Sequence, residues 1–186
     1  YAYVKPTSYD LHALPTFLEA PARLLKIPFK KELLESMVEK IKRTELYDSK
    51  LKMYKTSVSL DDESHEIGRV HAFTKGWLER ESNFLHMTYK YLLGLLKAGL
   101  YEAFYEAIKT NLICFMDPSV YGRSTLENSS FIAPSNNPNP YIHGQGFSAR
   151  LSGSTIETLN MWALMMTGGN PFKLKDGNLV CHFEPK

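Results

Sequence analysis

The spacing of apolar residues along the chain predicts three helices in its first two thirds. Within residues 21–44, the apolar positions follow the i, i+3, i+4 rhythm of an amphipathic helix; they are Leu33, Leu34, Met37, Val38 and Ile41. Residues 83–98 are apolar on nearly every side, which is typical of a buried helix. After Gly99, apolar residues recur every fourth position over residues 100–113. Two helices joined by so short a turn are expected to form an antiparallel αα-hairpin.

A further helix is predicted over about residues 155–167, with Ile156, Leu159, Ala163 and Met166 as its buried stripe. Gly168, Gly169 and Pro171 give the usual signal for the end of a helix. Residues 170–186 then predict a β-hairpin that turns at Asp176-Gly177, with residues 179–183 as a strand. The sequence offers this hairpin no obvious partner sheet.

The connecting segments are polar. Residues 48–66 alternate only in part and are expected to be extended or loop. Residues 117–145 are rich in Pro, Asn, Ser and Gly and predict a long irregular loop, a kind of segment that is usually functional or disordered. Its apolar residues favour an ordered loop lying over a surface; they are Tyr121, Phe131, Ile132 and Tyr141.

Composition excludes some classes of function. A chain of 186 residues is long enough for one domain with a core, and a net charge of +2 gives no support to nucleic-acid binding. The lysine-rich stretches at residues 30–31 and 40–43 are interpreted as solvated helix faces. No apolar run reaches the roughly 18–20 residues that span a bilayer. The first ten residues do not resemble a signal peptide, although the start at Tyr1 leaves a processed or truncated chain open.

Cys114 and Cys181 are the only cysteines, and so few thiols favour a reduced, cytoplasmic setting. His12, His71 and His182 do not have the spacing of metal ligands, so we expect no metal ion.

Residues 143–155, HGQGFSARLSGST, place small and donor-rich residues just before the last predicted helix. Ser154 and Glu157 fit a capping box, in which Ser154 is the N-cap. A cap does not require the two earlier glycines, His143 or Arg150. Because the N-terminus of a helix exposes backbone N–H groups and a positive dipole, the same segment also predicts an anion site at Ser152 and Gly153. His143 either approaches this site or packs on Tyr141.

A second group of candidate residues lies in residues 76–86, GWLERESNFLH. Trp77 offers a flat apolar face, and Glu79 and Glu81 offer carboxylates. This combination suits sugar rings, whose C–H faces stack on aromatic rings while their hydroxyls need acceptors. The alternatives are that Trp77 and His86 are core residues and that the two glutamates belong to a solvated turn.

Taken together, these segments resemble the C-terminal part of cellobiose-phosphorylase-like enzymes, the inverting phosphorylases of glycoside hydrolase family 94 and their β-glucan phosphorylase relatives. The family has a Glu seven residues before a His at a helix start, which matches Glu79 and His86. It later has a Ser/Thr-Gly pair, which matches Ser152 and Gly153, then a helix with Trp and a passage into a β-layer. The likeness covers residues 76–186. Residues 121–140 are more similar to the long-chain β-glucan phosphorylases than to the cellobiose enzymes.

The resemblance implies a mainly α fold, part of an (α/α)6 toroid built from αα-hairpins with a short C-terminal β segment. On this interpretation residues 1–75 form an N-terminal mixed segment and residues 76–168 form a helical half-toroid with the long loop 117–145. Residues 169–186 begin a C-terminal β-layer. The family's general acid lies far upstream of the matching histidine, so we expect the catalytic acid to lie outside this chain.

The resemblance also implies an activity: inorganic phosphate cleaves a β-glucoside or β-glucan to give α-glucose 1-phosphate. It assigns phosphate binding to His86, Ser152 and Gly153 and places Glu79 in the sugar site, to which the residues themselves add Trp77 and Glu81. Phosphate is then a co-substrate, no cofactor is expected, and a homodimer is an expectation from the family. Two alternatives stay open. The chain is a non-catalytic helical carbohydrate-binding or interaction module, or it is a toroidal hydrolase that pairs Glu79 or Glu81 with Asp117 or Glu127 across a water.

Overall fold

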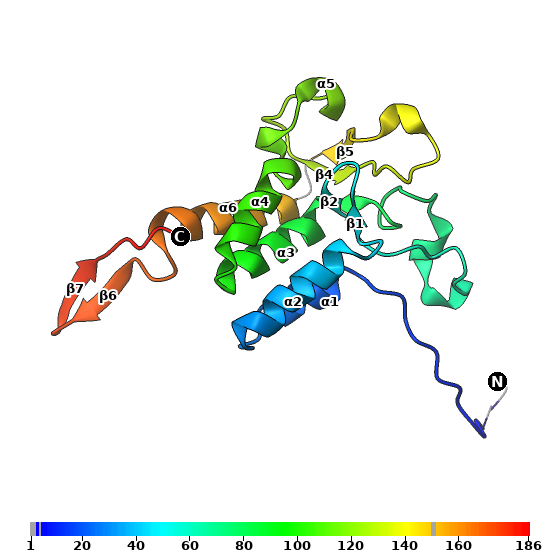
Figure 1. Ribbon diagram of the computed structural model, residues 1–186, viewed down its shortest axis with the longest axis horizontal. Helices are drawn as coiled ribbons and strands as arrows, with labels where there is room; N and C mark the ends of the chain where they lie inside the picture. Colours follow the sequence, from blue (N-terminus) through cyan, green and yellow to red (C-terminus); the bar gives the residue numbers. More distant parts are fainter. Residues whose placement is uncertain (1–2, 4, 150–151) are drawn as a thin grey trace.

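The computed structural model describes residues 3, 5–149 and 152–186, and the side chains of these residues apart from Ala149 and Ser152. Within this part of the chain, six α-helices and three small antiparallel sheets make a mixed α/β domain (Figure 1), of which 41% is helical and 14% is strand. The expected (α/α)6 toroid is therefore wrong, because a toroid needs many more helices. The αα-hairpin was identified correctly, but one hairpin is compatible with many folds.

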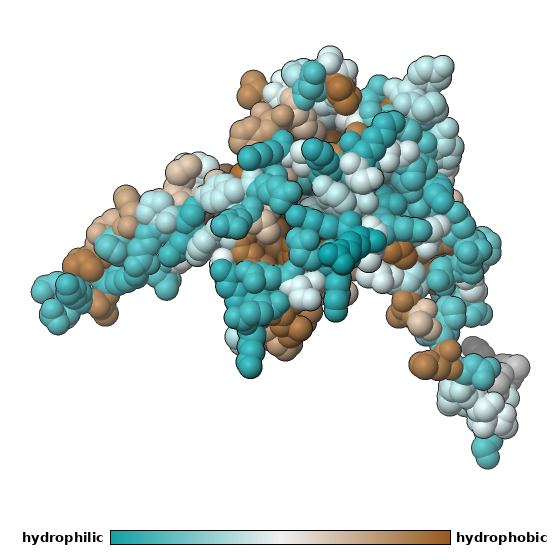
Figure 2. Space-filling model, viewed as in Figure 1, coloured by the Kyte–Doolittle hydropathy of each residue, from teal (hydrophilic) through white to brown (hydrophobic). Residues whose placement is uncertain are grey.

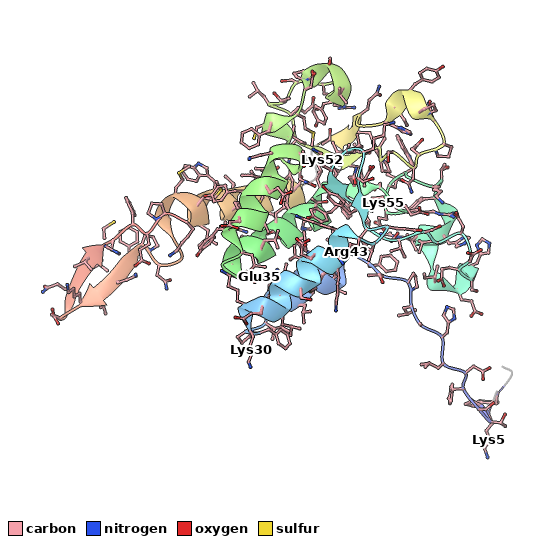
Figure 3. All side chains as sticks on the ribbon, viewed as in Figure 1. Lys5, Lys30, Glu35, Arg43, Lys52 and Lys55 are labelled. Atoms are coloured by element: carbon pink, nitrogen blue, oxygen red, sulfur yellow. The ribbon has the colours of Figure 1, made fainter. Side chains whose placement is uncertain are left out.

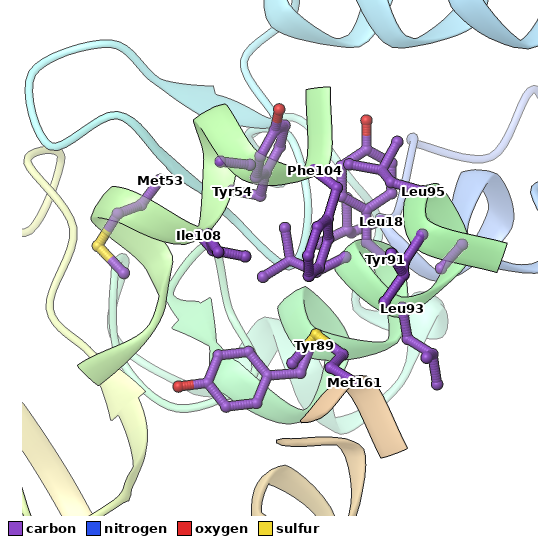
Figure 4. Close-up of a cluster of buried hydrophobic side chains, with 14 of the residues drawn as sticks. Leu18, Met53, Tyr54, Tyr89, Tyr91, Leu93, Leu95, Phe104, Ile108 and Met161 are labelled. Carbon is purple, nitrogen blue, oxygen red and sulfur yellow. The ribbon is translucent and has the colours of Figure 1, made fainter. Parts of the chain in front are cut away.

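Helix α3 (Leu85–Lys97) is the centre of the fold and packs against α1 (Glu19–Leu24), α4 (Tyr101–Asn111) and α6 (Ser152–Thr167). The other helices are α2 (Lys31–Lys42) and the short α5 (Pro118–Tyr121). Because α3 is apolar on nearly every side, it can be covered from several directions, and Leu85, Leu92 and Leu95 are fully buried. Figure 4 shows Leu95 in the buried cluster with Tyr91, Phe104 and Met161. The predicted αα-hairpin, α3 with α4, is confirmed.

The predicted amphipathic helix in residues 21–44 is confirmed as α2, which buries Leu34, Val38 and Ile41. The lysine-rich stretches around it are largely solvated, as expected: Lys30, Lys31, Lys40 and Arg43 are exposed, and Figure 3 shows Lys30 and Arg43 at opposite ends of the helix.

Three strands make the sheet that adjoins α3. They are β3 (Asn83–Phe84), β4 (Ser129–Ile132) and β5 (Gly146–Ala149), in the order β3-β4-β5, with Phe131 opposite both Phe84 and Phe147. A second ribbon pairs β1 (Tyr47–Asp48) with β2 (Met53–Tyr54). The prediction that residues 117–145 are irregular throughout is therefore wrong, because β4 is the central strand of the sheet and is buried along its whole length.

The rest of the segment 117–145 lies over the body of the protein, as predicted. Asp48 accepts hydrogen bonds from both the backbone N and the hydroxyl of Ser135, each at 2.7 Å. Tyr121 is fully buried, and its hydroxyl binds Ser129 at 2.5 Å. Tyr141, in contrast, is 88% exposed. Polar anchors and two buried aromatic residues, Tyr121 and Phe131, therefore hold a segment that has little regular structure.

Helix α6 differs from its prediction in two ways. It begins at Ser152, so Ser154 lies in its first turn. The predicted capping box, which required Ser154 to be the N-cap, is therefore wrong. It also buries Ser154 and Met161 against α3, while Ile156, Leu159 and Met166 of the predicted buried stripe are 54%, 60% and 49% exposed. The reason is that Glu157 is the only charged residue in α6, so apolar residues occupy more than one side and their spacing does not select the packed one.

Strands β6 (Phe172–Lys175) and β7 (Asn178–Cys181) form the predicted C-terminal hairpin. Asp176 and Gly177 both have positive φ, at 51° and 79°, as a type I′ turn requires. Figure 1 shows the hairpin projecting from the body beyond the end of α6.

Candidate functional site

The N-termini of α3 and α6 meet at His86 and Gly153. His86 is the second residue of α3, and a Cβ built on Gly153 would lie 2.6 Å from Nδ1 of its ring. The ring therefore packs directly on the first turn of α6, in contact with its backbone. Glu157, one turn further along, places Oε1 3.9 Å from His86 Nε2. The side chain of Ser152 and all of Arg150 lie outside the described residues, whereas His86 and Gly153 are brought together.

Asn128, which the sequence analysis did not single out, also reaches the first turn of α6. Its Nδ2 donates to the hydroxyl of Ser154 at 2.8 Å. Asn128 directly precedes β4, so the short strand that escaped the sequence analysis also positions this side chain.

The electrostatic setting of His86 favours its neutral form. Burial lowers the pKa of His86, and the positive charge of Lys90, one turn along α3, lowers it further, while Glu157 and Glu19 act in the opposite direction. A neutral imidazole that is 30% exposed can donate one N–H to an anion. Lys90 and the positive end of the 16-residue helix α6 add favourable potential for negative charge.

A line of aromatic rings leads from this point across the sheet, and we call it the aromatic row. Trp77 stacks on Phe147 with ring centroids 3.7 Å apart and planes within 2°. Phe147 stacks on Phe131 at 5.3 Å, and Phe131 on Phe84 at 4.5 Å. Phe84 meets the edge of His86 at 5.9 Å. Trp77, at the far end, is 36% exposed.

The sequence pattern indicates Trp77 and His86 as site residues but not the three phenylalanines between them, of which Phe131 was expected only as an apolar residue of the long loop. Phe84, Phe131 and Phe147 lie on strands of two to four residues, which are too short for an alternating pattern to stand out. Only strand pairing places them side by side.

The two candidate glutamates have different surroundings. Glu79 is 34% exposed and accepts a hydrogen bond from Arg69 at 2.7 Å. Glu81 is fully buried: its carboxylate accepts from Asn136 Nδ2 at 2.7 Å and lies 3.7 Å from Lys75 Nζ. Glu79 can therefore reach a ligand in solvent, whereas Glu81 joins residue 136 of the long loop to the turn that carries Trp77.

The backbone of that turn is strained. Leu78 and Glu81 both have left-handed φ, at 52° and 57°, and a bridge links Trp77 with Arg80. Side chains other than glycine are uncommon in this region and persist where their surroundings hold them, often at functional sites. Here the buried carboxylate of Glu81 is one such restraint, and Trp77 belongs to the turn that it supports.

The two other carboxylates considered for a hydrolase have local roles. Asp117 caps α5 by accepting from the backbone N of Ser119 at 2.8 Å, and Glu127 lies 3.5 Å from Arg123. The other two carboxylates accept hydrogen bonds, Glu79 from Arg69 and Glu81 from Asn136. Each of the four carboxylates therefore contacts a different neighbour.

Within the described part of the chain, no group of three or more His, Cys, Asp and Glu side chains is arranged to hold a metal ion. The ring of His143 interacts with the carbonyl of Asn137 at 2.8 Å, within the long loop. An open groove of about 650 Å³ runs between α2 and α4, and none of the candidate residues lines it. The absence of a metal or cofactor requirement stays a prediction.

Comparison of the sequence with models of known protein families gives no match, and comparison with curated proteins gives none either. None of the helices in the described ranges is long and apolar enough to cross a membrane.

Proposed function

We propose that this chain supplies the phosphate side of the site of an inverting phosphorylase that acts on β-glucosides or β-glucans, and that it releases α-glucose 1-phosphate as part of a longer protein. The observation that carries the proposal is the contact between His86 and Gly153 at the end of the aromatic row. It joins an anion-binding geometry to a surface suited to sugar rings. The motifs in residues 76–186 that resemble those of glycoside phosphorylases suggested this reaction, and no comparison with known proteins tests that resemblance.

In this proposal His86 and the first turn of α6, Ser152 and Gly153 included, hold inorganic phosphate. A phosphate oxygen attacks the anomeric carbon of the glucosyl unit while the glycosidic C–O bond breaks on the opposite face. A general acid outside this chain gives its proton to the departing oxygen. Fixing the phosphate beside the developing positive charge of the sugar lowers the barrier by positioning and by electrostatic stabilisation.

Trp77 and Glu79 would contact the sugar: the indole packs on its C–H face, and the carboxylate accepts from its hydroxyls. Glu81 would act indirectly, by holding the turn that carries them. Phosphate is the co-substrate, no cofactor is needed, and we place the reaction in the cytoplasm, consistent with the free, exposed thiols of Cys114 and Cys181.

A second candidate is a carbohydrate-binding module without catalysis. The aromatic row favours it, because stacked rings with one exposed indole suit a sugar surface whether or not phosphate is present.

The test measures release of glucose 1-phosphate from cellobiose and laminari-oligosaccharides, with and without inorganic phosphate. It compares this chain with the longest natural protein that contains it. We expect phosphate-dependent release from the long form alone. Release of free sugar independent of phosphate would identify a hydrolase. Binding of oligosaccharide without any release by the long form would identify the binding module.

The chain alone gives a second readout, because phosphate should bind without turnover. Titration of inorganic phosphate by calorimetry is expected to show binding to the unmodified chain and strong weakening in His86→Ala. Asparagine is the matched polar substitution, since His86→Asn keeps a donor at the site but loses the ring. Equal phosphate affinity in all three proteins would overturn the assignment of His86.

A further inference from the structure

A small cavity lies where the ribbon of β1 and β2 packs beside α4 and the end of α2. Its volume is about 290 Å³, at the lower end of the roughly 300–1,000 Å³ that is usual for ligand pockets. A molecule with a single ring suits such a volume better than a chain of sugars does. The side chains that line the cavity include Lys42, Tyr47, Lys52, Tyr54, Glu106 and Lys109.

The turn that carries Lys52 is fixed on α4. The carbonyl oxygen of Lys52 accepts hydrogen bonds from the hydroxyl of Thr110 at 2.7 Å and from Nδ2 of Asn111 at 3.1 Å. Asn111 is fully buried, and its Oδ1 accepts from the backbone N of Tyr54 at 3.3 Å. Figure 3 shows Lys52 beside α4. One buried amide therefore holds both Lys52 and Tyr54 in place at the cavity.

The backbone of Lys52 has a left-handed conformation, with φ at 55°. Residues with long side chains are uncommon in this region, and those that adopt it are concentrated at ligand sites. Glycine would adopt the same conformation without steric cost. A lysine at this position is therefore explained if its side chain has a role.

The cavity has an excess of positive charge. Three of its described lining residues are lysines and one, Glu106, is a carboxylate, which accepts a hydrogen bond from Lys42 at 2.9 Å. Lys52 and Lys109 are exposed and form no ion pair with any described residue. Figure 2 shows mainly hydrophilic residues over α4 and the ribbon. Two positive charges in excess match a phosphate monoester, which carries about −1.5 to −2 at pH 7, better than a carboxylate with its single charge.

Two tyrosine rings give the cavity an apolar wall. Tyr54 is 1% exposed, whereas Tyr47 is half-buried, and their ring centroids lie 5.2 Å apart. An aromatic face beside ammonium groups suits a ring that bears an anionic substituent. The ring of such a ligand packs on the tyrosine, while its anionic group meets the lysines.

We propose that this cavity binds a phosphorylated small molecule with a single ring, whose phosphate is held by Lys52 and Lys109 and whose ring packs on Tyr47. The inference goes beyond the proposed function and does not depend on it, because neither His86 nor Gly153 lines the cavity. The charge and the volume define the ligand as a phosphate monoester on one ring, and this ring is either aromatic or a sugar.

The test follows the ring signals of Tyr47 and Tyr54 by NMR during titration of the 186-residue chain. The probes are phenyl phosphate and glucose 6-phosphate, which carry the same dianion on an aromatic ring and on a sugar ring. We expect saturable shifts at both tyrosines, and the probe that binds more tightly identifies the kind of ring. Benzoate, which has an aromatic ring but one negative charge, is expected to bind several-fold more weakly than phenyl phosphate. Absence of shifts with both phosphates would overturn the proposal, as would equal affinity for benzoate and phenyl phosphate.

Lys52→Gln and Lys109→Gln are each expected to weaken phenyl phosphate binding roughly fivefold, the upper end of what an exposed charge pair contributes. Both side chains face solvent, so circular dichroism of each variant should match that of the unmodified protein. Lys50→Gln is the matched control, because Lys50 is exposed in the same turn but does not line the cavity. It should leave the affinity unchanged, as should His86→Ala, which separates this cavity from the proposed phosphate site. Equal weakening by Lys50→Gln and Lys52→Gln would show an unspecific effect of net charge and would overturn the proposal.

Discussion

The imidazole of His86 packs so closely on Gly153 that a methyl group at residue 153 would lie 2.6 Å from the ring nitrogen Nδ1. This contact joins the starts of two helices that lie far apart in the sequence, α3 at Leu85 and α6 at Ser152, and it is the basis of the proposed phosphate site.

Gly153→Ala tests this contact directly. The new methyl must displace the ring of His86, and overpacking of this kind costs about 1–3 kcal/mol. We expect a lower urea midpoint and phosphate binding weakened roughly tenfold, as each 1.4 kcal/mol changes an affinity by that factor. Gly169→Ala is the control, since its Cβ would meet only Leu164 at an ordinary 3.9 Å. Unchanged phosphate affinity in Gly153→Ala would contradict the proposed site.

Lys90→Met is expected to raise the pKa of His86 toward its ordinary value, because burial and the charge of Lys90 both lower it. The measurement is a titration of the His86 ring protons by NMR. Because the pKa of His86 is lower in the folded chain than in the unfolded chain, the unfolded chain binds the proton first as the pH falls. The stability contributed by neutral His86 is therefore present above about pH 6.5, the ordinary pKa of the unfolded chain, and is lost as the pH falls from there through the lower folded pKa. Saturating phosphate should also raise the pKa, and a pKa insensitive to phosphate would argue against direct contact.

Trp77→Ala removes the exposed end of the aromatic row. Stacked aromatic contacts contribute about 0.5–1.5 kcal/mol beyond their buried area, so we expect laminari-oligosaccharide affinity to fall several-fold. Affinity electrophoresis through a gel containing the glucan measures this. Trp77→Phe keeps a ring on Phe147 and should retain most of the binding. If alanine and phenylalanine behave alike, and both like the unmodified protein, the indole does not contact the sugar.

Glu81→Gln and Glu79→Gln separate support of the site from contact with a ligand. Glu81 is buried and contacts Asn136 and Lys75, and an imperfectly satisfied buried group costs about 1–3 kcal/mol, so its substitution should lower the free energy of unfolding by that amount. Glu79 pairs with Arg69 at the surface, where such pairs contribute less than about 1 kcal/mol. Urea denaturation distinguishes the two. We expect Glu79→Gln to weaken sugar binding at nearly unchanged stability. If instead Glu79→Gln lowers stability and Glu81→Gln weakens only sugar binding, Glu81 contacts the sugar and Glu79 supports the turn.

The sequence by itself determined the elements whose signal is local. The periodic apolar positions fixed α2 and the α3–α4 hairpin, because one face or the whole of each helix must be buried. Asp176-Gly177 fixed the C-terminal turn, since both residues must adopt positive φ. His86 was correctly expected near the start of the buried helix.

Only the tertiary structure decided which side of α6 is packed, because a helix with a single charge has no polar side to mark the solvent. It also decided that the family-derived toroid does not form within the described residues, that Phe84, Phe131 and Phe147 align into a row, and that Glu81 is buried while Glu79 is not. Strand pairing and loop docking bring together residues far apart in the chain. Such contacts depend on the whole arrangement of elements, so the local spacing of residues in the sequence does not predict them.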